Sequence, residues 1–144
     1  MKEKKLIIFG EGSYAEIVQQ YFTDDSEYEV VCFTKDDDFI ESDQYLGLPM
    51  VPFSKIQALY PPDSFAIHIA LTYSEMNRLR ETKFNEAKMM GYTLASYISS
   101  KCSIMTKYPI GENCFIFEDN TVQPFVKIGD NVILWSGNHI GHHS

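Results

Sequence analysis

The fold is decided by a motif that recurs in the last third of the chain and reads Ile110-Gly111-Glu112-Asn113, Ile128-Gly129-Asp130-Asn131 and Ile140-Gly141-His142-His143. Around it, every sixth residue is aliphatic: Ile98, Ile104, Ile110, Ile116, Val122, Ile128, Leu134 and Ile140. A period of six fits neither an amphipathic helix nor an alternating strand. It is typical of a hexapeptide β-helix, in which three hexads form one triangular coil. We therefore expect Ile110 to stack on Ile128, Ile116 on Leu134 and Val122 on Ile140.

Composition and charge narrow the class of protein. The 144 residues fit one ordinary domain or two small ones, and 44% hydrophobic with 22% charged residues is typical of a soluble globular protein. A net charge of -8 argues against a nucleic-acid backbone or an anionic membrane surface as the main partner. No apolar stretch approaches the length that spans a membrane.

The cysteines and the amino terminus favour a cytoplasmic location. Cys32, Cys102 and Cys114 are odd in number and lack a CxxC spacing, which favours reduced structural thiols. The apolar run Leu6–Phe9 after the lysine-rich start is too short for a signal peptide, and it fits a first buried strand.

The first two thirds of the chain alternate between strand and helix patterns. We expect strands at 6–9, 29–34, 65–70 and 93–98, with 39–52 irregular because Gly47 and Pro49 break the pattern. This alternation predicts an α/β fold, a Rossmann-like small parallel sheet with helices on its faces. The period changes near Tyr97, so we divide the chain into domains at 1–96 and 97–144.

Three helices should connect these strands. The first ends near Phe22, a short one covers Ser54–Leu59 with Ser54 as its N-cap, and a longer one runs from about Ser74 to Met90. The residues expected to face inward are Ala15, Ile17, Val18 and Tyr21 or Phe22 in the first helix, and Met76, Leu79, Phe84, Ala87 and Met90 in the third.

A glycine-rich turn follows the first strand and is the first candidate site. Gly10-x-Gly12-x-x-Ala15 opens a helix, which places backbone N–H groups and a helix N-terminus where a phosphate could bind. Ser13 could donate a further hydrogen bond, and Tyr14 belongs to the same turn. The alternative is a tight strand-to-helix turn that binds nothing.

An acidic run, Asp36-Asp37-Asp38, follows the second strand and could accept hydrogen bonds from a base or sugar. NAD is one candidate ligand, but the sheet lacks the second half of a dinucleotide-binding fold. A mononucleotide or a nucleotide-sugar fits its size better. The alternatives for the run are a solvated loop and a metal site, and the metal site lacks partner ligands nearby.

Three of the four histidines lie close together near the end of the chain: His139, His142 and His143. At a corner of the coil, His142 or His143 could act as a general base, because the pKa of histidine is near neutrality. A zinc site would need a further ligand from elsewhere. Surface histidines without a role are the third possibility. Trp135 could contact a partner subunit or a ligand, or simply cover the coil.

Together, the Gly10-x-Gly12 turn and the hexapeptide repeat resemble the sugar acyltransferases of the sialic-acid O-acetyltransferase and bacillosamine N-acetyltransferase type. The resemblance covers essentially the whole chain and implies a left-handed parallel β-helix. It further implies transfer of an acetyl group from acetyl-CoA, as co-substrate and without a metal, to a hydroxyl or amine of a nucleotide-linked sugar in glycan biosynthesis. Acetyl-CoA would lie between neighbouring β-helices of a homotrimer.

The resemblance also implies roles for individual residues. His142 corresponds to the catalytic base, and His143 stands where the family usually has Asp or Glu. The nucleotide-sugar would be held by the first domain, at Gly10, Gly12, Ser13, Asp36 and Asp37.

The family's later coils and a capping element do not follow Ser144, so we expect a C-terminally truncated chain that retains acceptor binding better than catalysis. One alternative function is a non-catalytic nucleotide or nucleotide-sugar binding module with a β-helix stub for assembly. Another is an NAD-binding regulatory domain.

Overall fold

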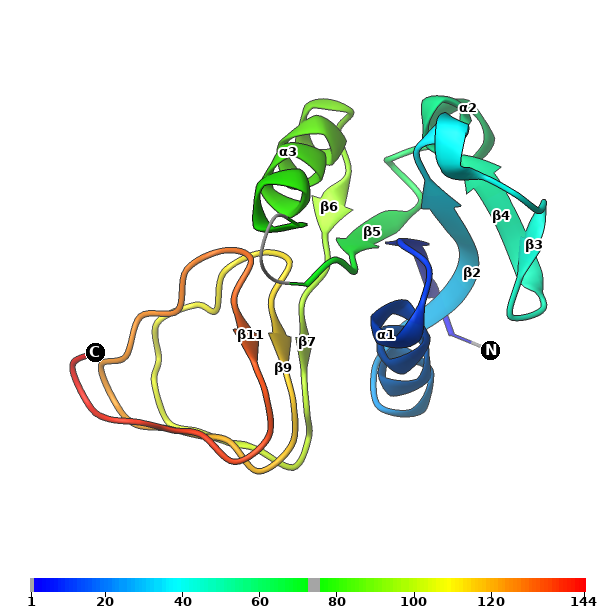
Figure 1. Ribbon diagram of the computed structural model, residues 1–144. Helices are drawn as coiled ribbons and strands as arrows, with labels where there is room; N and C mark the ends of the chain where they lie inside the picture. Colours follow the sequence, from blue (N-terminus) through cyan, green and yellow to red (C-terminus); the bar gives the residue numbers. More distant parts are fainter. Residues whose placement is uncertain (1, 73–75) are drawn as a thin grey trace. The chain divides into compact units, whose positions relative to one another are not determined.

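A computed structural model of the protein describes residues 2–72 and 76–144, without the side chains of residues 76 and 77. The chain forms two compact units, Met1–Ala95 and Ser96–Ser144 (Figure 1). The first is an α/β unit and the second consists of parallel β-helix coils, which confirms the predicted fold class.

The first unit is built on a six-stranded sheet with the order β3-β4-β2-β1-β5-β6. All neighbouring strands are parallel except the β3–β4 pair. The strands are β1 (Lys4–Phe9), β2 (Tyr28–Lys35), β3 (Gln44–Tyr45), β4 (Leu48–Pro52), β5 (Ala66–Ile69) and β6 (Thr93–Leu94). The helical segments are α1 (Ser13–Asp24), η1 (Asp37–Phe39), η2 (Phe53–Lys55), α2 (Ile56–Leu59) and α3 (Met76–Met89).

Apolar residues cover both faces of this sheet. Successive side chains of a strand point to opposite faces, so the continuous buried runs of β1 and β5 supply both. On one face, strand residues such as Ile7 and Ile67 pack in a buried cluster with Ile56 of α2 and with Phe84 and Ala87 of α3. Helix α1 lies on the other side of the sheet in Figure 1. Its buried residues are Ala15, Val18 and Phe22, and the Phe22 ring contacts the ring of buried His68.

Two of the helix residues predicted to face inward are exposed instead. Ile17 and Leu79 are each 38% exposed. In α3 the inward stripe is Arg80, Lys83, Phe84 and Ala87, at the spacing of one helix face. The prediction chose residues by hydrophobicity, whereas α3 buries two cations. The predicted helix start at Ser74 and the Met76 side chain lie outside the described residues.

The segment 39–52, predicted to be irregular, contains a β-hairpin. Strands β3 and β4 pair around a two-residue turn, Leu46-Gly47, with φ of 51° and 78°. Positive φ at both turn residues is typical of the tight hairpin turn that matches the twist of the strands. Gly47 therefore joins two strands, and β4 continues alongside β2 from Met50 onward.

Two further boundaries differ from the prediction. Ser54 does not cap a helix, because α2 begins at Ile56 and Ser54 donates instead to Asp37. Residues 93–98 form two strands rather than one. Strand β6 pairs with β5, whereas β7 (Tyr97–Ile98) pairs with β9 of the second unit.

The second unit stacks short strands in two three-stranded parallel sheets, β7-β9-β11 and β8-β10-β12. The pairs Ile116–Leu134 and Val122–Ile140 have the predicted register. On the third side, the Gly111 N–H donates to Ile128 O at 3.0 Å. The strands are β8 (Ser103–Ile104), β9 (Phe115–Ile116), β10 (Thr121–Val122), β11 (Ile133–Leu134) and β12 (His139–Ile140).

The corners of the coil recur every six residues in a left-handed backbone conformation. Their φ values lie between 56° and 83°, at Asn113, Asp119, Phe125, Asn131, Gly137 and His143. Asn, Asp and Gly adopt this conformation most readily, so Asn113, Asp119, Asn131 and Gly137 need no separate account. The other two corners carry bulky rings, those of Phe125 and His143.

A buried asparagine bonds the interior of two coils together. Asn120 is 1% exposed, and its amide donates to Phe117 O at 2.8 Å and to Leu134 O at 3.3 Å. Its side-chain oxygen accepts the Asn138 N–H at 2.9 Å. These bonds satisfy an amide whose burial would otherwise be costly.

Gly111 and Gly129 occupy equivalent places in successive coils but differ in the space around them. A Cβ on Gly111 would lie 2.3 Å from Gly129 O, whereas a Cβ on Gly129 would meet nothing within 4 Å. We expect Gly111→Ala to lower the free energy of unfolding by about 1–3 kcal/mol through overpacking. Gly129→Ala should stay within about 0.5 kcal/mol of the parent.

Urea unfolding followed by the fluorescence of Trp135, the single tryptophan, reports on this second unit. Equal free energies of unfolding for the two variants would contradict the stacked geometry.

His68 should make the first unit sensitive to acid. Burial lowers the pKa of His68 to about 3, while its Nδ1–H donates to Ala95 O at 2.8 Å. The unfolded chain therefore binds a proton below about pH 6.5 that the folded chain excludes. The stability that neutral His68 gives is complete above this pH. It is lost at up to about 1.4 kcal/mol per pH unit as the pH falls towards 3.

The His68→Asn variant keeps an N–H donor without a titrating ring. Urea unfolding followed by circular dichroism between pH 7 and 5.5 should show a flatter pH slope for this variant than for the parent. The same slope in both proteins would rule out His68 as the cause.

Candidate functional site

The glycine-rich turn lies at the carboxyl edge of the parallel sheet. The Gly10 N–H donates to Thr34 O of β2 at 2.9 Å, and the Ala70 N–H donates to Phe9 O at 2.8 Å. A Cβ on Gly10 would lie 2.8 Å from Ala70 O, and φ of Gly10 is 136°, so glycine is required here. The connections after β1 and β5 lead to opposite sides of the sheet, and ligands of such sheets bind at this point of divergence.

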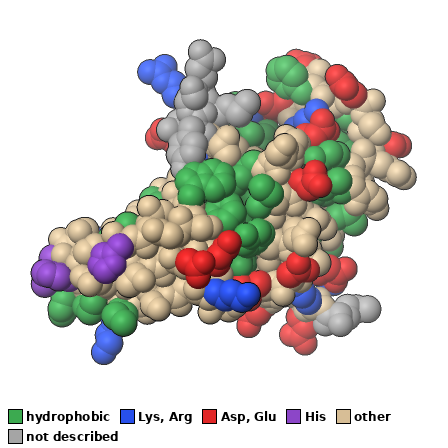
Figure 2. Space-filling model, turned by 60° about the horizontal axis from the view of Figure 1, so that its bottom comes forward, with side chains coloured by type: hydrophobic (Ala, Val, Ile, Leu, Met, Phe, Trp, Pro, Cys, Tyr) green, Lys and Arg blue, Asp and Glu red, His purple; other side chains and the backbone are tan. Residues whose placement is uncertain are grey.

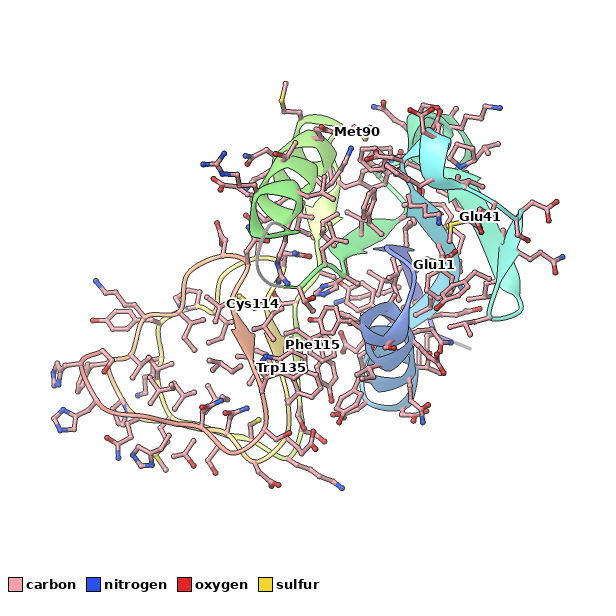
Figure 3. The ribbon with its side chains drawn as sticks, in the orientation of Figure 1. Glu11, Glu41, Met90, Cys114, Phe115 and Trp135 are labelled. Atoms are coloured by element: carbon pink, nitrogen blue, oxygen red, sulfur yellow. The ribbon has the colours of Figure 1, made fainter. Side chains whose placement is uncertain are left out.

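Gly12 forms the N-cap of α1 with φ of 112° and brings no side chain to bond the first turn. Exposed Ser13 begins the helix and half-buried Tyr14 follows it. The partial positive charge of the helix N-terminus favours an anion at this place. Glu11, between the two glycines and labelled in Figure 3, pairs with Lys35 at 3.4 Å.

Tyr45 holds this turn, and sequence reasoning missed it. Its hydroxyl accepts the Gly12 N–H at 3.0 Å and donates to Gly12 O at 3.2 Å. The ring packs edge-on against Phe33 with centroids 4.9 Å apart. Tyr45 is distant in sequence and belongs to the hairpin within the segment predicted to be irregular. The dipeptide Leu46-Gly47 was the only local signal for that hairpin.

The two acidic residues predicted to bind a sugar already have partners within the protein. Asp36 Oδ1 lies 2.5 Å from Lys83 Nζ, which also contacts Glu86 at 3.1 Å. Burial lowers the pKa of Lys83, but the bonds to Asp36 and Glu86 outweigh it and leave the pKa raised. The Asp37 carboxylate accepts the Ser54 hydroxyl at 2.5 Å and the Ser54 N–H at 3.2 Å. These bonds lower the pKa of Asp37.

Helix α3 thus brings two cations to the region around the carboxyl edge. Arg80 is 2% exposed and its Nη1 donates to Leu71 O at 2.5 Å, just after β5. Lys83 Nζ lies 4.8 Å from the centre of the Phe53 ring. Sequence reasoning missed both cations. The signal was their spacing relative to Phe84 and Ala87, which puts all four on one helix face.

The second candidate group is the histidine pair of the second unit. The His142 Nδ1 and His143 Nδ1 atoms lie 3.0 Å apart, and the His142 N–H donates to Gln123 Oε1 at 2.9 Å. Both side chains are exposed, as is that of His139 on β12. Figure 2 shows the histidines (purple) gathered at one end of the second unit. Both rings are accessible to a substrate from outside the coil.

Neither a metal site nor a membrane span is found within residues 2–72 and 76–144. No group of three potential ligands among the histidines, cysteines and carboxylates there could hold a metal ion. No helix in the same ranges is long and apolar enough to cross a membrane. The histidines therefore stand as a pair, without a third metal ligand among these residues.

Trp135 follows β11 on the outside of the coil. Its ring stacks on Phe117 with centroids 4.7 Å apart and an angle of 23°, and it is 39% exposed. Trp135 and Phe115 are labelled in Figure 3, on the same side of the second unit. The stacked Phe117 ring covers one face of the indole ring.

Comparison with protein families gives two matches. The model of the PglD N-terminal domain matches residues 5–87, and the model of the bacterial transferase hexapeptide (six repeats) matches residues 110–142. A comparison with curated proteins found no match. The two matched ranges fall in the first and second units respectively.

Solved structures with the same fold cover almost the whole chain. The acetyltransferase domain of PglB from Neisseria gonorrhoeae, in complex with acetyl coenzyme A, is 22% identical with a TM-score of 0.78, over 98% of this chain and 66% of that one. PerB from Caulobacter crescentus, in complex with CoA and GDP-perosamine, is 20% identical with a TM-score of 0.75, over 96% and 63%.

A third structure is a variant of perosamine N-acetyltransferase from Caulobacter crescentus in which one histidine is replaced by asparagine. It is 19% identical with a TM-score of 0.74, over 94% of this chain and 62% of that one. The chain thus spans about two thirds of the length of these proteins.

The predicted resemblance is confirmed at the level of the family. A PglD-type first unit is followed by hexapeptide coils, which is the domain order that the resemblance implies. The model of the PglD N-terminal domain matches more than half of the chain's residues, so the chain belongs to the PglD N-terminal domain family.

Proposed function

We propose that the protein is a sugar acetyltransferase that moves an acetyl group from acetyl-CoA to a hydroxyl or amine of a nucleotide-linked sugar. The observation that carries the proposal is the union, in one chain, of a PglD N-terminal domain with hexapeptide coils that expose a histidine pair. Solved proteins of the same fold bind acetyl coenzyme A in one case and CoA with GDP-perosamine in another.

The acceptor's nucleotide is assigned to the carboxyl edge of the first unit. Gly10 and Gly12 permit a close approach of the backbone, and Ser13 with Tyr14 opens α1, whose N-terminus favours phosphate. Asp36 is assigned to the ribose or base because it follows β2 at the same edge. Asp36 bonds to Lys83 through Oδ1, whereas both carboxylate oxygens of Asp37 accept bonds from Ser54, so Asp37 is the weaker candidate.

The chemistry is assigned to His142. Its imidazole takes a proton from the acceptor hydroxyl or amine as the nucleophile attacks the thioester carbonyl carbon. The tetrahedral intermediate then collapses, the C–S bond breaks, and CoA leaves as the thiolate and takes up a proton. Exposure of the His142 side chain gives an acceptor access to it. His143 supports this base through the contact between the two Nδ1 atoms.

The setting of the reaction follows from its substrates. We propose a homotrimer in which acetyl-CoA lies between neighbouring β-helices, and a role in surface-polysaccharide or other glycan biosynthesis. The reduced thiols of Cys32, Cys102 and Cys114 suit a reducing cytoplasmic compartment. No metal is assigned to the reaction, because a histidine base needs none.

Nucleotide-sugar binding is the first test. In a thermal-shift screen, GDP-, UDP- and dTDP-sugars should raise the Tm, because a ligand at about 100 times its Kd adds about 2.7 kcal/mol of stability. Acetyl-CoA and NAD are screened in parallel. Stabilisation by NAD alone would contradict the proposal and favour a regulatory NAD-binding domain.

The base is tested by replacing His142 with alanine in an acetyl-transfer assay with the stabilising nucleotide-sugar. We expect kcat to fall by about 10²–10⁴-fold while acceptor affinity is retained, because general-base catalysis contributes this much. His139→Ala is the matched control, since His139 is exposed on the neighbouring strand β12.

Unchanged turnover in His142→Ala would remove His142 as the base. Nucleotide-sugar binding with no transfer by the parent protein would instead favour a binding module.

A further inference from the structure

Phe125 stands at a corner where the coil alone gives no reason for an aromatic residue. Its φ is 66° and it is 56% exposed, whereas the corners at 113, 119, 131 and 137 hold Asn, Asp, Asn and Gly. A bulky side chain in the left-handed region is uncommon. Strained backbone of this kind persists mainly where it serves a function. Phe125 therefore calls for an explanation from its contacts.

Those contacts lead to the histidine pair. The Phe125 ring stacks face-to-face on the His143 ring, with centroids 4.8 Å apart and an angle of 18°. The His143 N–H points to Pro124 O at 3.4 Å, and the His142 N–H donates to Gln123 Oε1 at 2.9 Å. Gln123, Pro124 and Phe125 form one corner. Each of them contacts His142 or His143 in the corner that lies next to it in the stack.

We propose that Gln123 and Phe125 are positioning residues for His142. Gln123 fixes the backbone of His142, and Phe125 fixes the ring plane of His143. The Nδ1 atom of His143 then holds the imidazole of His142. The inference rests on the proposed function, in which His142 accepts the acceptor's proton.

The bond between the two histidines selects the reactive nitrogen. In a hydrogen bond between two imidazole nitrogens, one nitrogen donates and the other accepts. A base that accepts the substrate proton at Nε2 carries its own hydrogen on Nδ1. His142 is therefore the donor and His143 the acceptor. His143 takes the orienting role of a carboxylate, but without its charge, so ring stacking must supply the restraint on its orientation.

Substitution at Phe125 separates positioning from folding. Phe125→Asn introduces a residue that suits the left-handed corner, so the Tm should be unchanged or higher. Phe125→Tyr keeps the stacking ring. Asp119→Asn is the matched control, because Asp119 is an exposed corner residue with φ of 61°. Gln123→Ala tests the second contact.

The histidines are observed by nuclear magnetic resonance of their ring nitrogens and protons. Phe125→Asn should remove the ring-current shift of His143 and change the tautomer signals of His142. Phe125→Tyr and Asp119→Asn should keep both. In the acetyl-transfer assay, Phe125→Asn should lower kcat about tenfold or more with KM unchanged, because misplacing a catalytic group by about 1 Å can cost 10²-fold. Gln123→Ala should act in the same direction, and Phe125→Tyr should restore kcat.

Histidine signals in Phe125→Asn that match the parent would overturn the inference, as would an unchanged kcat. If the parent transfers acetyl groups and Phe125→Asn does so equally well, the proposed function stands and the positioning role fails. If the parent transfers none, the proposed function fails, and the resonance signals alone decide whether Phe125 orders the histidine pair.

Discussion

Parallel pairing between residues 18 positions apart is the constraint on which the second unit depends. The Phe115 N–H donates to Val132 O and the Thr121 N–H to Asn138 O, so each coil satisfies its backbone groups with the next one. Two consequences follow from this spacing. Equivalent positions of successive coils must lie directly over one another, and the backbone of Gly129 and Asp130 then leaves no room for a Cβ on Gly111. Each corner must also contain a residue in the left-handed conformation, and such residues recur with the six-residue period.

The same kind of pairing organises the first unit in a different way. Its parallel strands need crossover connections, so the strand ends at Phe9, Thr34 and Ile69 meet at one edge. The loops after them carry the glycine turn, the acidic run and the residue that Arg80 binds. The candidate nucleotide site is therefore a product of topology, and the residues there come from segments far apart in the sequence. Tyr45 is the clearest case, since a hydroxyl from an edge hairpin holds the Gly12 peptide.

Much of the fold could be predicted because its signals are periodic. The aliphatic residue in every hexad predicted the coil and its register, and the apolar runs predicted β1, β2 and β5. Short elements were predicted wrongly where they depended on one residue whose type fits two different local structures. A glycine such as Gly47 breaks a strand pattern, but with Leu46 it makes a hairpin turn. The position of Ser54 predicts an N-cap, whereas its hydroxyl bonds to Asp37.

The candidate site could be predicted only in outline, because side-chain partners depend on the fold. The glycine turn and the histidine pair are local in sequence and were recognised. Lys83 and Arg80 were not, since their helical spacing puts them on the inward face but does not show which carboxylate or carbonyl each would bind. The contact between Phe125 and His143 joins two hexads and likewise becomes visible only once the coils are stacked.

The buried Asn120 has a consequence for how the chain finds its pairing. A repeat with the same apolar residue in every hexad could slide by six residues and still fill its interior. Asn120 and Asn138 share one column, whereas Cys114, Val126 and Val132 hold the same hexad place in the neighbouring columns. A chain displaced by one hexad would set the Asn120 amide against a valine and lose the bond to Asn138, at a cost of about 1–3 kcal/mol. One polar side chain thereby distinguishes the native alignment from its near-identical competitors.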